Sequence, residues 1–319
     1  ETFSSEYEIT EYNECDVILV DEAHEHNTNM DLILTIVRYT LIYNNDIKLG
    51  IISATMENDE DKYRNYYRLV DDNLSYPVNT FNMQCKLNRF MIDRRLHISA
   101  PGTTTKFNIK EFYDDDNYID TYEKNEELAL KKLDKIFKET DTGDVLLFSN
   151  SVNSIKNIVN KMNSSGIQDN IIILPYFGEM KERFKKYCKK PSKNLINLDV
   201  DKKDIFDYFK GEKTYDQVKK VSKNTYNRAC IVATNVAEAS LTISSLKYVI
   251  DIGFQINIKY NYDSQIYEVN NNKINEVSRV QRKGRVGRVG GGTVYYMYPK
   301  GSRENVNSSY AICNENFND

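Results

Sequence analysis

The chain contains 319 residues, of which 40% are hydrophobic and 28% are charged, a balance typical of globular proteins with room for two domains. Its formal net charge is −4, whereas most nucleic-acid-binding domains carry an excess of basic residues. An acidic protein can still carry a local basic groove. No apolar run approaches about 18 residues, so we expect no membrane partner. The 5 cysteines are scattered without a C-x-x-C pair, which predicts reduced thiols in an intracellular protein.

The first predicted elements lie between residues 15 and 70. Residues 15–20 (CDVILV) form a short apolar run that is typical of a buried parallel strand. Residues 30–43 repeat apolar side chains at helical spacing, and residues 48–52 read as a second buried strand. A helix is expected over 59–70.

The second group of elements begins after an extended stretch, 96–113, that is broken by Pro101-Gly102. The domain boundary is expected between about 91 and 107, which gives domains at 1–95 and 96–319. The predicted elements are helix 124–140, strand 145–148, helix 152–162, strand 171–174, a Lys-rich, less regular segment 181–223, strand 230–233, a β-hairpin over about 255–277 and strand 293–298. Alternating strands and helices predict an α/β fold with parallel sheets covered by helices on both faces.

Four short motifs occur in a fixed order along the chain. They are Asp21-Glu22-Ala23-His24, Ser53-Ala54-Thr55, ATNVAEAS at 233–240 and QRKGRVGR at 281–288. In this order and spacing they resemble motifs II, III, V and VI of superfamily 2 helicases of the DEAH-box type. The last motif is closest in form to that of the poxvirus nucleoside triphosphate phosphohydrolase II and its relatives in large DNA viruses. The resemblance covers about 15–298 and implies two RecA-like domains, the first incomplete.

The family's phosphate-binding loop, G-x-x-x-x-G-K-[ST], does not occur in the sequence. Residues 101–106 (PGTTTK) lack its second glycine and its spacing. We therefore expect the chain to be a fragment without the Walker A loop, or a protein that has lost this half-domain. By itself it is expected to hydrolyse ATP poorly or not at all.

Motif II follows the first strand, and open α/β sheets bind ligands beyond the carboxyl ends of their strands. Phosphoryl transfer needs a carboxylate that holds Mg²⁺. The resemblance implies that Asp21 holds the metal and the nucleotide, Glu22 assists with the metal and orients the attacking water, and His24 couples the nucleotide to motif VI. A zinc site is rejected because the H-E-x-x-H spacing is absent. In motif III, the resemblance makes Ser53 and Thr55 a relay between the ATP site and the nucleic-acid channel.

Motif V follows the strand at 230–233 and opens a loop or a helix N-terminus, where unpaired N–H groups can meet phosphates. By resemblance, Thr234 and Asn235 contact the nucleic-acid backbone, and Ser240 lies near the nucleotide. Asp251, in the later segment VIDIG, matches a residue that binds the ribose. The alternative is a plain helix cap at Thr234 and a surface carboxylate at Glu238.

Motif VI is expected on a helix, where Arg285 and Arg288 are three residues apart and would share a face. Guanidinium groups suit bidentate phosphate binding. The resemblance implies that Arg288 is the arginine finger, Arg285 a γ-phosphate ligand, and Gln281 a contact to water or γ-phosphate, with Arg282 structural. A basic helix that is solvated or bound to nucleic acid is the alternative, and the spaced glycines disfavour it.

Two other segments have candidate roles in nucleic-acid binding. The hairpin over 255–277 either acts as a wedge at a duplex junction, as the resemblance implies, or simply completes the sheet. Residues 181–190 (KERFKKYCKK) interleave basic and aromatic side chains, which fits either contact with a single strand by charge and stacking or a plain exposed helix. Tyr226 is a guess for a residue that stacks on a base.

Together these features predict an ATP-dependent RNA helicase or translocase that uses ATP or another NTP with Mg²⁺ and acts on single-stranded or duplex RNA, with DNA possible. The alternatives are a non-catalytic nucleic-acid-binding or assembly module and a DNA-directed translocase of the same superfamily. We expect a monomer in the host cytoplasm, or in the virion if the protein is viral.

Overall fold

The computed structural model describes residues 15–23, 28–43, 47–53, 62–63, 66–67, 107–116, 119–304 and 306. The chain divides into two compact units. One comprises Glu1–Ile98, Tyr262–Ser264 and Ser309–Asp319, and the other comprises Ser99–Asn261 and Gln265–Ser308. None of the helices in the described ranges is both long and apolar enough to cross a membrane.

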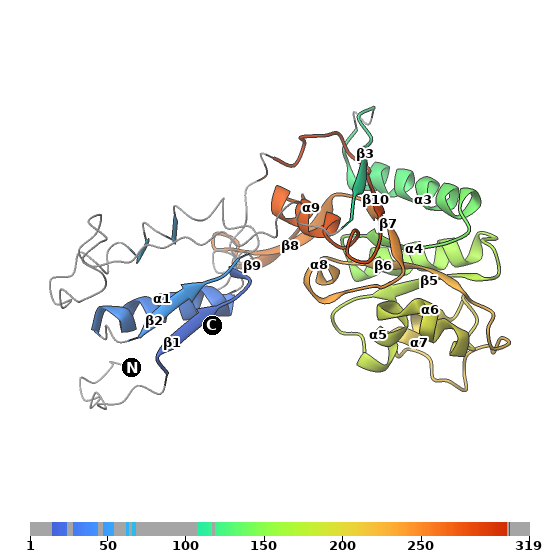
Figure 1. The fold of residues 1–319 in the computed structure, drawn as a ribbon, viewed down its shortest axis with the longest axis horizontal. Coiled ribbons are helices and arrows are strands. Elements are labelled where there is room, and N and C mark those ends of the chain that lie inside the picture. Colours follow the sequence, from blue (N-terminus) through green and yellow to red (C-terminus); the bar gives the residue numbers. More distant parts are fainter. Residues whose placement is uncertain are drawn as a thin grey trace. The chain divides into compact units, whose positions relative to one another are not determined.

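The first unit contains a pair of parallel strands and a helix, drawn in blue in Figure 1. Strand β1 (Val17–Val20) pairs with β2 (Lys48–Ile51), and α1 spans Thr28–Tyr43. Val20, Leu34 and Tyr67 are buried together, and the Tyr67 hydroxyl donates to the Leu34 carbonyl at 2.9 Å. The two strands and the helix predicted for 15–52 are confirmed, and residues 62–63 and 66–67 of the predicted helix 59–70 are helical. The predicted burial of the first strand is wrong, because Val17 and Leu19 are exposed.

The second unit is built on a six-stranded sheet in which every neighbouring pair is parallel. In spatial order the strands are β3 (Ile109–Tyr113), β10 (Gly292–Tyr296), β7 (Leu246–Asp251), β4 (Asp144–Phe148), β6 (Arg228–Ala233) and β5 (Ile171–Tyr176). All residues of β4, β5 and β6 are buried, as expected for strands covered on both faces. The predicted α/β fold with parallel sheets is confirmed.

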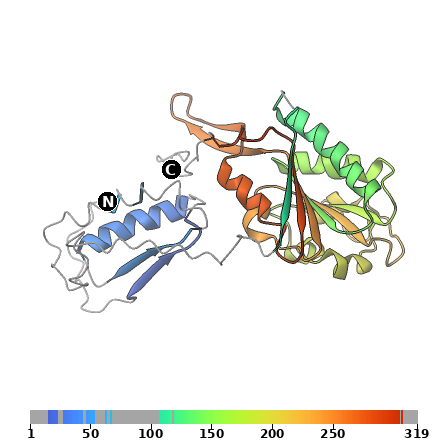
Figure 2. The same cartoon turned by 45° about the horizontal axis from the view of Figure 1, so that its top comes forward.

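Helices α3 (Tyr122–Glu139) and α4 (Val152–Ser164) lie on one face of this sheet, and α9 (Glu276–Lys283) lies on the other (Figure 2). Each begins at a side-chain cap, because the oxygens of Thr121, Ser151 and Asn275 accept from the backbone N–H three residues later. The short helix α8 (Val236–Ser240) follows β6 and contacts α9. These caps fix where the chain enters each helix.

The Lys-rich segment after β5 is more regular than predicted. It forms α5 (Glu182–Lys189), α6 (Pro191–Asn194), the 3₁₀ helix η3 (Leu195–Asn197) and α7 (Ile205–Lys210). The ring of Phe184 stacks on Phe209 with 4.8 Å between centroids, so burial of aromatic side chains orders this segment. Tyr226 is also buried, and its hydroxyl donates to the Val200 carbonyl at 3.0 Å. The guess that Tyr226 stacks on a base is therefore wrong.

The predicted β-hairpin is confirmed. Strand β8 (Phe254–Asn261) pairs with β9 (Ile266–Lys273) in an antiparallel register that places Tyr260 opposite Tyr267. Several apolar side chains of the hairpin are exposed, including Ile258 and Val269.

Candidate functional site

The second unit brings motifs V and VI together at the carboxyl ends of three adjacent strands. Phe148, Ala233 and Asp251 are the last residues of β4, β6 and β7. Motif V leaves the sheet at Ala233, and motif VI reaches the same edge from α9. Ligands of open parallel sheets bind at this edge, so it is the candidate site of this unit.

Arg282 of motif VI joins these elements through a buried ion-pair network. Its side chain is 0% exposed, its Nε lies 2.7 Å from Glu238 Oε1, and one terminal nitrogen lies 2.7 Å from Asp251 Oδ1. The guanidinium also lies 4.8 Å from the ring centroid of Phe148. Burial opposes the charge of Arg282, but the two carboxylates outweigh burial and raise its pKa above the ordinary value. Arg282 therefore binds motif VI to the end of motif V and to β7.

Asp251 occupies the centre of this network. Its Oδ1 accepts from Arg282 and, at 2.8 Å, from the Gly253 N–H, while its Oδ2 accepts from the Tyr298 hydroxyl at 2.7 Å. The side chain is fully buried. The structure corrects the predicted ribose contact, because both carboxylate oxygens are engaged inside the protein and neither is exposed to a nucleotide.

Burial raises the pKa of Glu238 despite the opposing effect of Arg282. The alternative of a surface carboxylate at Glu238 is wrong, because this side chain is buried at 8% exposure. Its partner Arg282 lies 44 residues away along the chain, so no local pattern indicates the ion pair. The Ser240 side chain lies outside the described residues.

Arg285 and Arg288 do not lie on the helix, so the prediction that they share a helical face is wrong. Helix α9 ends at Lys283, with Gly284 as its C-cap, and Gly287 adopts a left-handed φ of 77° that favours glycine. The helix therefore ends before both arginines, and Gly287 turns the backbone between them. The last turn of α9 keeps Gln281, which is partly buried.

The loop after α9 instead places both arginines beside the segment that follows α8. Arg285 donates to the Leu241 carbonyl at 3.5 Å. Arg288 Nε donates to the Gly284 carbonyl at 2.9 Å, and a terminal nitrogen lies 3.2 Å from the Thr242 hydroxyl. Arg285 is partly buried and Arg288 is exposed. Motifs V and VI therefore contact each other, with cationic groups at their junction.

A second polar cluster holds α9 against β3 and β10. Glu111 of β3 pairs with Lys283 and, at 3.1 Å, with Arg279, and it accepts from the Tyr296 hydroxyl at 2.9 Å. Burial opposes ionisation of Glu111, but the hydrogen bonds from Lys283 and Tyr296 lower its pKa overall. Sequence reasoning missed this cluster, since Glu111 is 172 residues from Lys283.

The other two motif V residues differ in exposure. Thr234 is buried, at 9% exposed, whereas Asn235 is exposed and occupies the N-cap position of α8 without a side-chain cap bond. Only Asn235 presents its side chain fully to a ligand in this arrangement.

Motif II lies in the first unit, directly after β1. Asp21 and Glu22 are both exposed, and the Glu22 N–H donates to Asp21 Oδ1 at 2.8 Å. Glu22 adopts a φ of 57°, in the left-handed region that non-glycine residues rarely use. The next residue, Ala23, is buried, and its N–H donates to the Ile52 carbonyl at 3.0 Å.

Because Ser53 directly follows Ile52, this bond brings the starts of motifs II and III together. His24 and Thr55 lie outside the described residues. In the described ranges, no group of three or more His, Cys, Asp or Glu side chains gathers to hold a metal ion.

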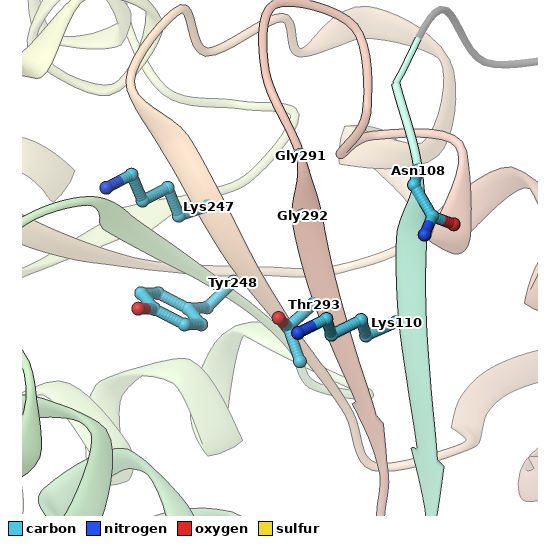
Figure 3. Close-up of a pocket in the computed structure, with 7 residues that line it drawn as sticks. All are labelled: Asn108, Lys110, Lys247, Tyr248, Gly291, Gly292 and Thr293. Atoms are coloured by element: carbon cyan, nitrogen blue, oxygen red, sulfur yellow. The ribbon is translucent and has the colours of Figure 1, made fainter.

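One hollow of about 330 Å³ lies at the opposite edge of the six-stranded sheet (Figure 3). It is lined by residues at the amino-terminal ends of β3, β7 and β10, namely Asn108, Lys110, Lys247, Tyr248, Gly291, Gly292 and Thr293. None of the motif residues lines it, so it is not the candidate site.

Comparison with known families and structures identifies the class of this fold. Residues 176–290 match the family model described as the helicase conserved C-terminal domain. This range begins at the last residue of β5 and includes motifs V and VI. The second unit therefore contains a helicase C-terminal domain of RecA-like fold.

Individual relatives agree with this class. The chain is 38% identical over 309 residues to a putative ATP-dependent RNA helicase of Acanthamoeba polyphaga mimivirus, a match that covers 96% of this chain and 17% of that protein. It is 28% identical over 289 residues to the ATP-dependent RNA helicase HrpA of Borreliella burgdorferi, covering 90% of this chain and 28% of that protein. The chain thus spans less than a third of the length of these relatives.

Among solved structures, the DEAH/RHA helicase HrpB of Escherichia coli is similar to the chain with a TM-score of 0.58 and 18% sequence identity. The match covers 92% of this chain and 30% of that one. At this identity the likeness supports the fold.

Proposed function

We propose that this chain contributes motifs II, III, V and VI to an ATP-dependent RNA helicase, in which NTP hydrolysis drives movement along single-stranded RNA and unwinding of duplexes. The observation that carries the proposal is the junction of motifs V and VI. There Arg282 is buried by two carboxylates, whereas Arg285 and Arg288 emerge beside Leu241 and Thr242.

In this proposal Arg288 is the arginine finger and Arg285 binds the γ-phosphate. Within the described residues no carboxylate pairs with Arg288, and its hydrogen bonds go to neutral oxygens. A planar guanidinium that is not already neutralised can form charge-assisted bonds to phosphate oxygens. Gln281, in the adjacent turn of α9, would contact the γ-phosphate or the attacking water.

Asp21 and Glu22 are the residues that would hold Mg²⁺. Hard divalent cations prefer carboxylate and water oxygens, and both side chains are exposed at the carboxyl end of β1. The ion would neutralise charge on the phosphates when bound. The left-handed backbone at Glu22 supports this assignment, since strained conformations concentrate at functional sites. Glu22 would orient the attacking water and accept its proton.

Asn235, exposed at the start of α8, would contact the RNA backbone with Thr234 beside it. Ser240 would lie near the nucleotide, His24 would couple nucleotide state to motif VI, and Ser53 and Thr55 would relay between the two ligand sites. The names of both relatives as ATP-dependent RNA helicases support RNA as the nucleic acid.

The test is NTP turnover of the natural full-length protein, measured with no nucleic acid, with single-stranded RNA and with single-stranded DNA of the same sequence. We expect stimulation by RNA and its loss in Glu22→Gln, which keeps the shape of the side chain but removes its basicity. Stimulation by DNA alone would favour a DNA-directed translocase. RNA binding without turnover would favour a non-catalytic module.

A further inference from the structure

The segment after β5 is basic although the chain is acidic. Residues 181–227 contain fourteen Lys or Arg and seven Asp or Glu, a formal charge of +7, whereas the entire chain carries −4. Such a local concentration of charge is the electrostatic footprint of a surface that binds a polyanion.

Helix α5 is fixed in one orientation by its apolar side. Phe184 and Cys188 are buried at 2% and 0% exposure, and Phe184 stacks on Phe209 of α7. Arg183 and Lys186 are one turn apart, on the side of the helix away from these buried residues. Both are exposed, so the buried side holds the basic side towards solvent.

Basic residues of this segment fall into two groups. In one group the side chains pair with nearby carboxylates, as Lys210 does with Glu212 at 2.8 Å and Lys213 with Asp204 at 2.7 Å. The other group is exposed and makes no ion pair with any residue that the structure describes. Five of its members lie on α5, on α6 or next to them, and we call these five the α5–α6 basic face: Lys181, Arg183, Lys186, Lys190 and Lys193.

We infer that the α5–α6 basic face binds the phosphate backbone of single-stranded RNA, as a contact surface separate from motif V. The inference rests on the proposed function and adds a second RNA-binding surface to it. Unpaired exposed Lys and Arg side chains bind phosphates mainly by releasing counterions, without reading the sequence.

The same packing removes Phe184, one of the two aromatic rings of this helix, from base stacking. The ring of Phe184 is buried, and the half-buried ring of Tyr187 lies 5.7 Å from Phe209. The inference therefore retains the charge contact from the hypothesis for residues 181–190 and does not include base stacking. The contact is with phosphates, and it has no base preference.

The experiment compares the natural full-length protein with a triple variant, Arg183→Ala, Lys186→Ala and Lys190→Ala. Binding of a labelled single-stranded RNA is measured over a range of salt concentrations. Each lost phosphate contact lowers the slope of log K against log salt by about 0.7 on single strands. Three contacts therefore change the slope by about 2, and affinity at 0.1 M salt falls roughly ten- to hundredfold.

The matched control removes the same charge from paired lysines, with Lys210→Ala, Lys213→Ala and Lys219→Ala. Its slope should equal that of the wild type, because these side chains already pair with Glu212, Asp204 and Asp201. NTP turnover without RNA should be the same in all three proteins, which confirms that they are folded.

The outcomes separate this inference from the proposed function. A wild-type protein that binds no RNA overturns both. Normal RNA binding with an unchanged slope in the basic-face variant, or an equal change in the control variant, overturns only the α5–α6 basic face. A binding loss that varies with base composition would also contradict it.

Discussion

Helix α9 and the loop that follows it use their arginines in opposite ways. In the helix, Arg282 is fully buried between Glu238 and Asp251, and Arg279 pairs with Glu111. In the loop, Arg288 is exposed, and its bonds to described residues go to neutral oxygens. The comparison shows that one short motif contains both a buried arginine that joins elements of the domain and an exposed arginine that, in the proposed function, binds phosphate. Substitutions should therefore separate into losses of stability and losses of turnover.

The largest effect is expected from Arg288→Ala. Arginine fingers contribute about 10³–10⁵ to the turnover number, so NTP turnover of the full-length protein should fall by about this factor. The unfolding temperature should not change, because the side chain is exposed. Equal turnover in variant and wild type would remove Arg288 from the catalytic site.

The next effect is expected from Arg282→Met, which tests the buried arginine. Removing one partner of a buried ion pair costs about 3–5 kcal/mol, because uncompensated charges stay buried. Here Glu238 and Asp251 would both lose their cation. Thermal unfolding should shift strongly downward, and adding Glu238→Gln to the variant should recover part of the loss. An unshifted transition would show that the network does not stabilise the domain.

A smaller loss of stability is expected from Glu111→Ala, which releases α9 from β3. Lys283, Arg279 and the Tyr296 hydroxyl would each lose a hydrogen-bond acceptor, at a total cost of about 1–3 kcal/mol. The matched control is Glu127→Ala, since Glu127 pairs with Lys131 on an exposed helix surface and should change nothing measurable. Similar unfolding midpoints for the two variants would contradict the role of Glu111.

The smallest effect is expected from Asp120→Asn and concerns the loss of stability at low pH. Burial opposes ionisation of Asp120, but hydrogen bonds from Arg303, Lys273 and Asn125 lower its pKa below the usual 3.8. Because the folded pKa lies below the unfolded one, the stabilisation is complete above about pH 4 and is lost as the pH falls further. Unfolding temperatures measured from pH 6 to pH 3 should fall less steeply in Asp120→Asn than in the wild type. If the unfolding temperatures of variant and wild type fall in parallel with pH, Asp120 does not contribute to the acid sensitivity of the fold.

The strands of the second unit could be predicted from the sequence, because buried parallel strands are apolar along their whole length. Val145–Phe148 and Cys230–Ala233 are such runs, and all of these residues are buried. In the first unit the apolar runs also form strands, although Val17 and Leu19 of β1 are exposed. The hairpin was predictable from the alternation of apolar and polar side chains between Gln255 and Val269. These patterns are local, so one sequence reveals them.

The errors in the candidate site came from interactions that are distant along the chain or from local backbone geometry. The buried role of Asp251 depends on Arg282 and Tyr298, which are 31 and 47 residues away. The end of α9 was misplaced because the glycines of motif VI were interpreted as helical. The helices within residues 181–223 are stabilised by contacts such as that of Phe184 with Phe209. The Lys-rich composition of the segment gives no indication of these contacts.

The strand order of the second unit has a consequence for synthesis on the ribosome. Strand β3 pairs only with β10 within the described sheet, and the two are separated by roughly 180 residues. At typical translation rates of about 5–20 residues per second, β3 waits roughly 10–40 s for its partner. During this interval its backbone N–H and C=O groups have no neighbouring strand. Glu111 and Lys110, both on β3, give the waiting strand the charged side chains that discourage pairing with a strand of another nascent chain.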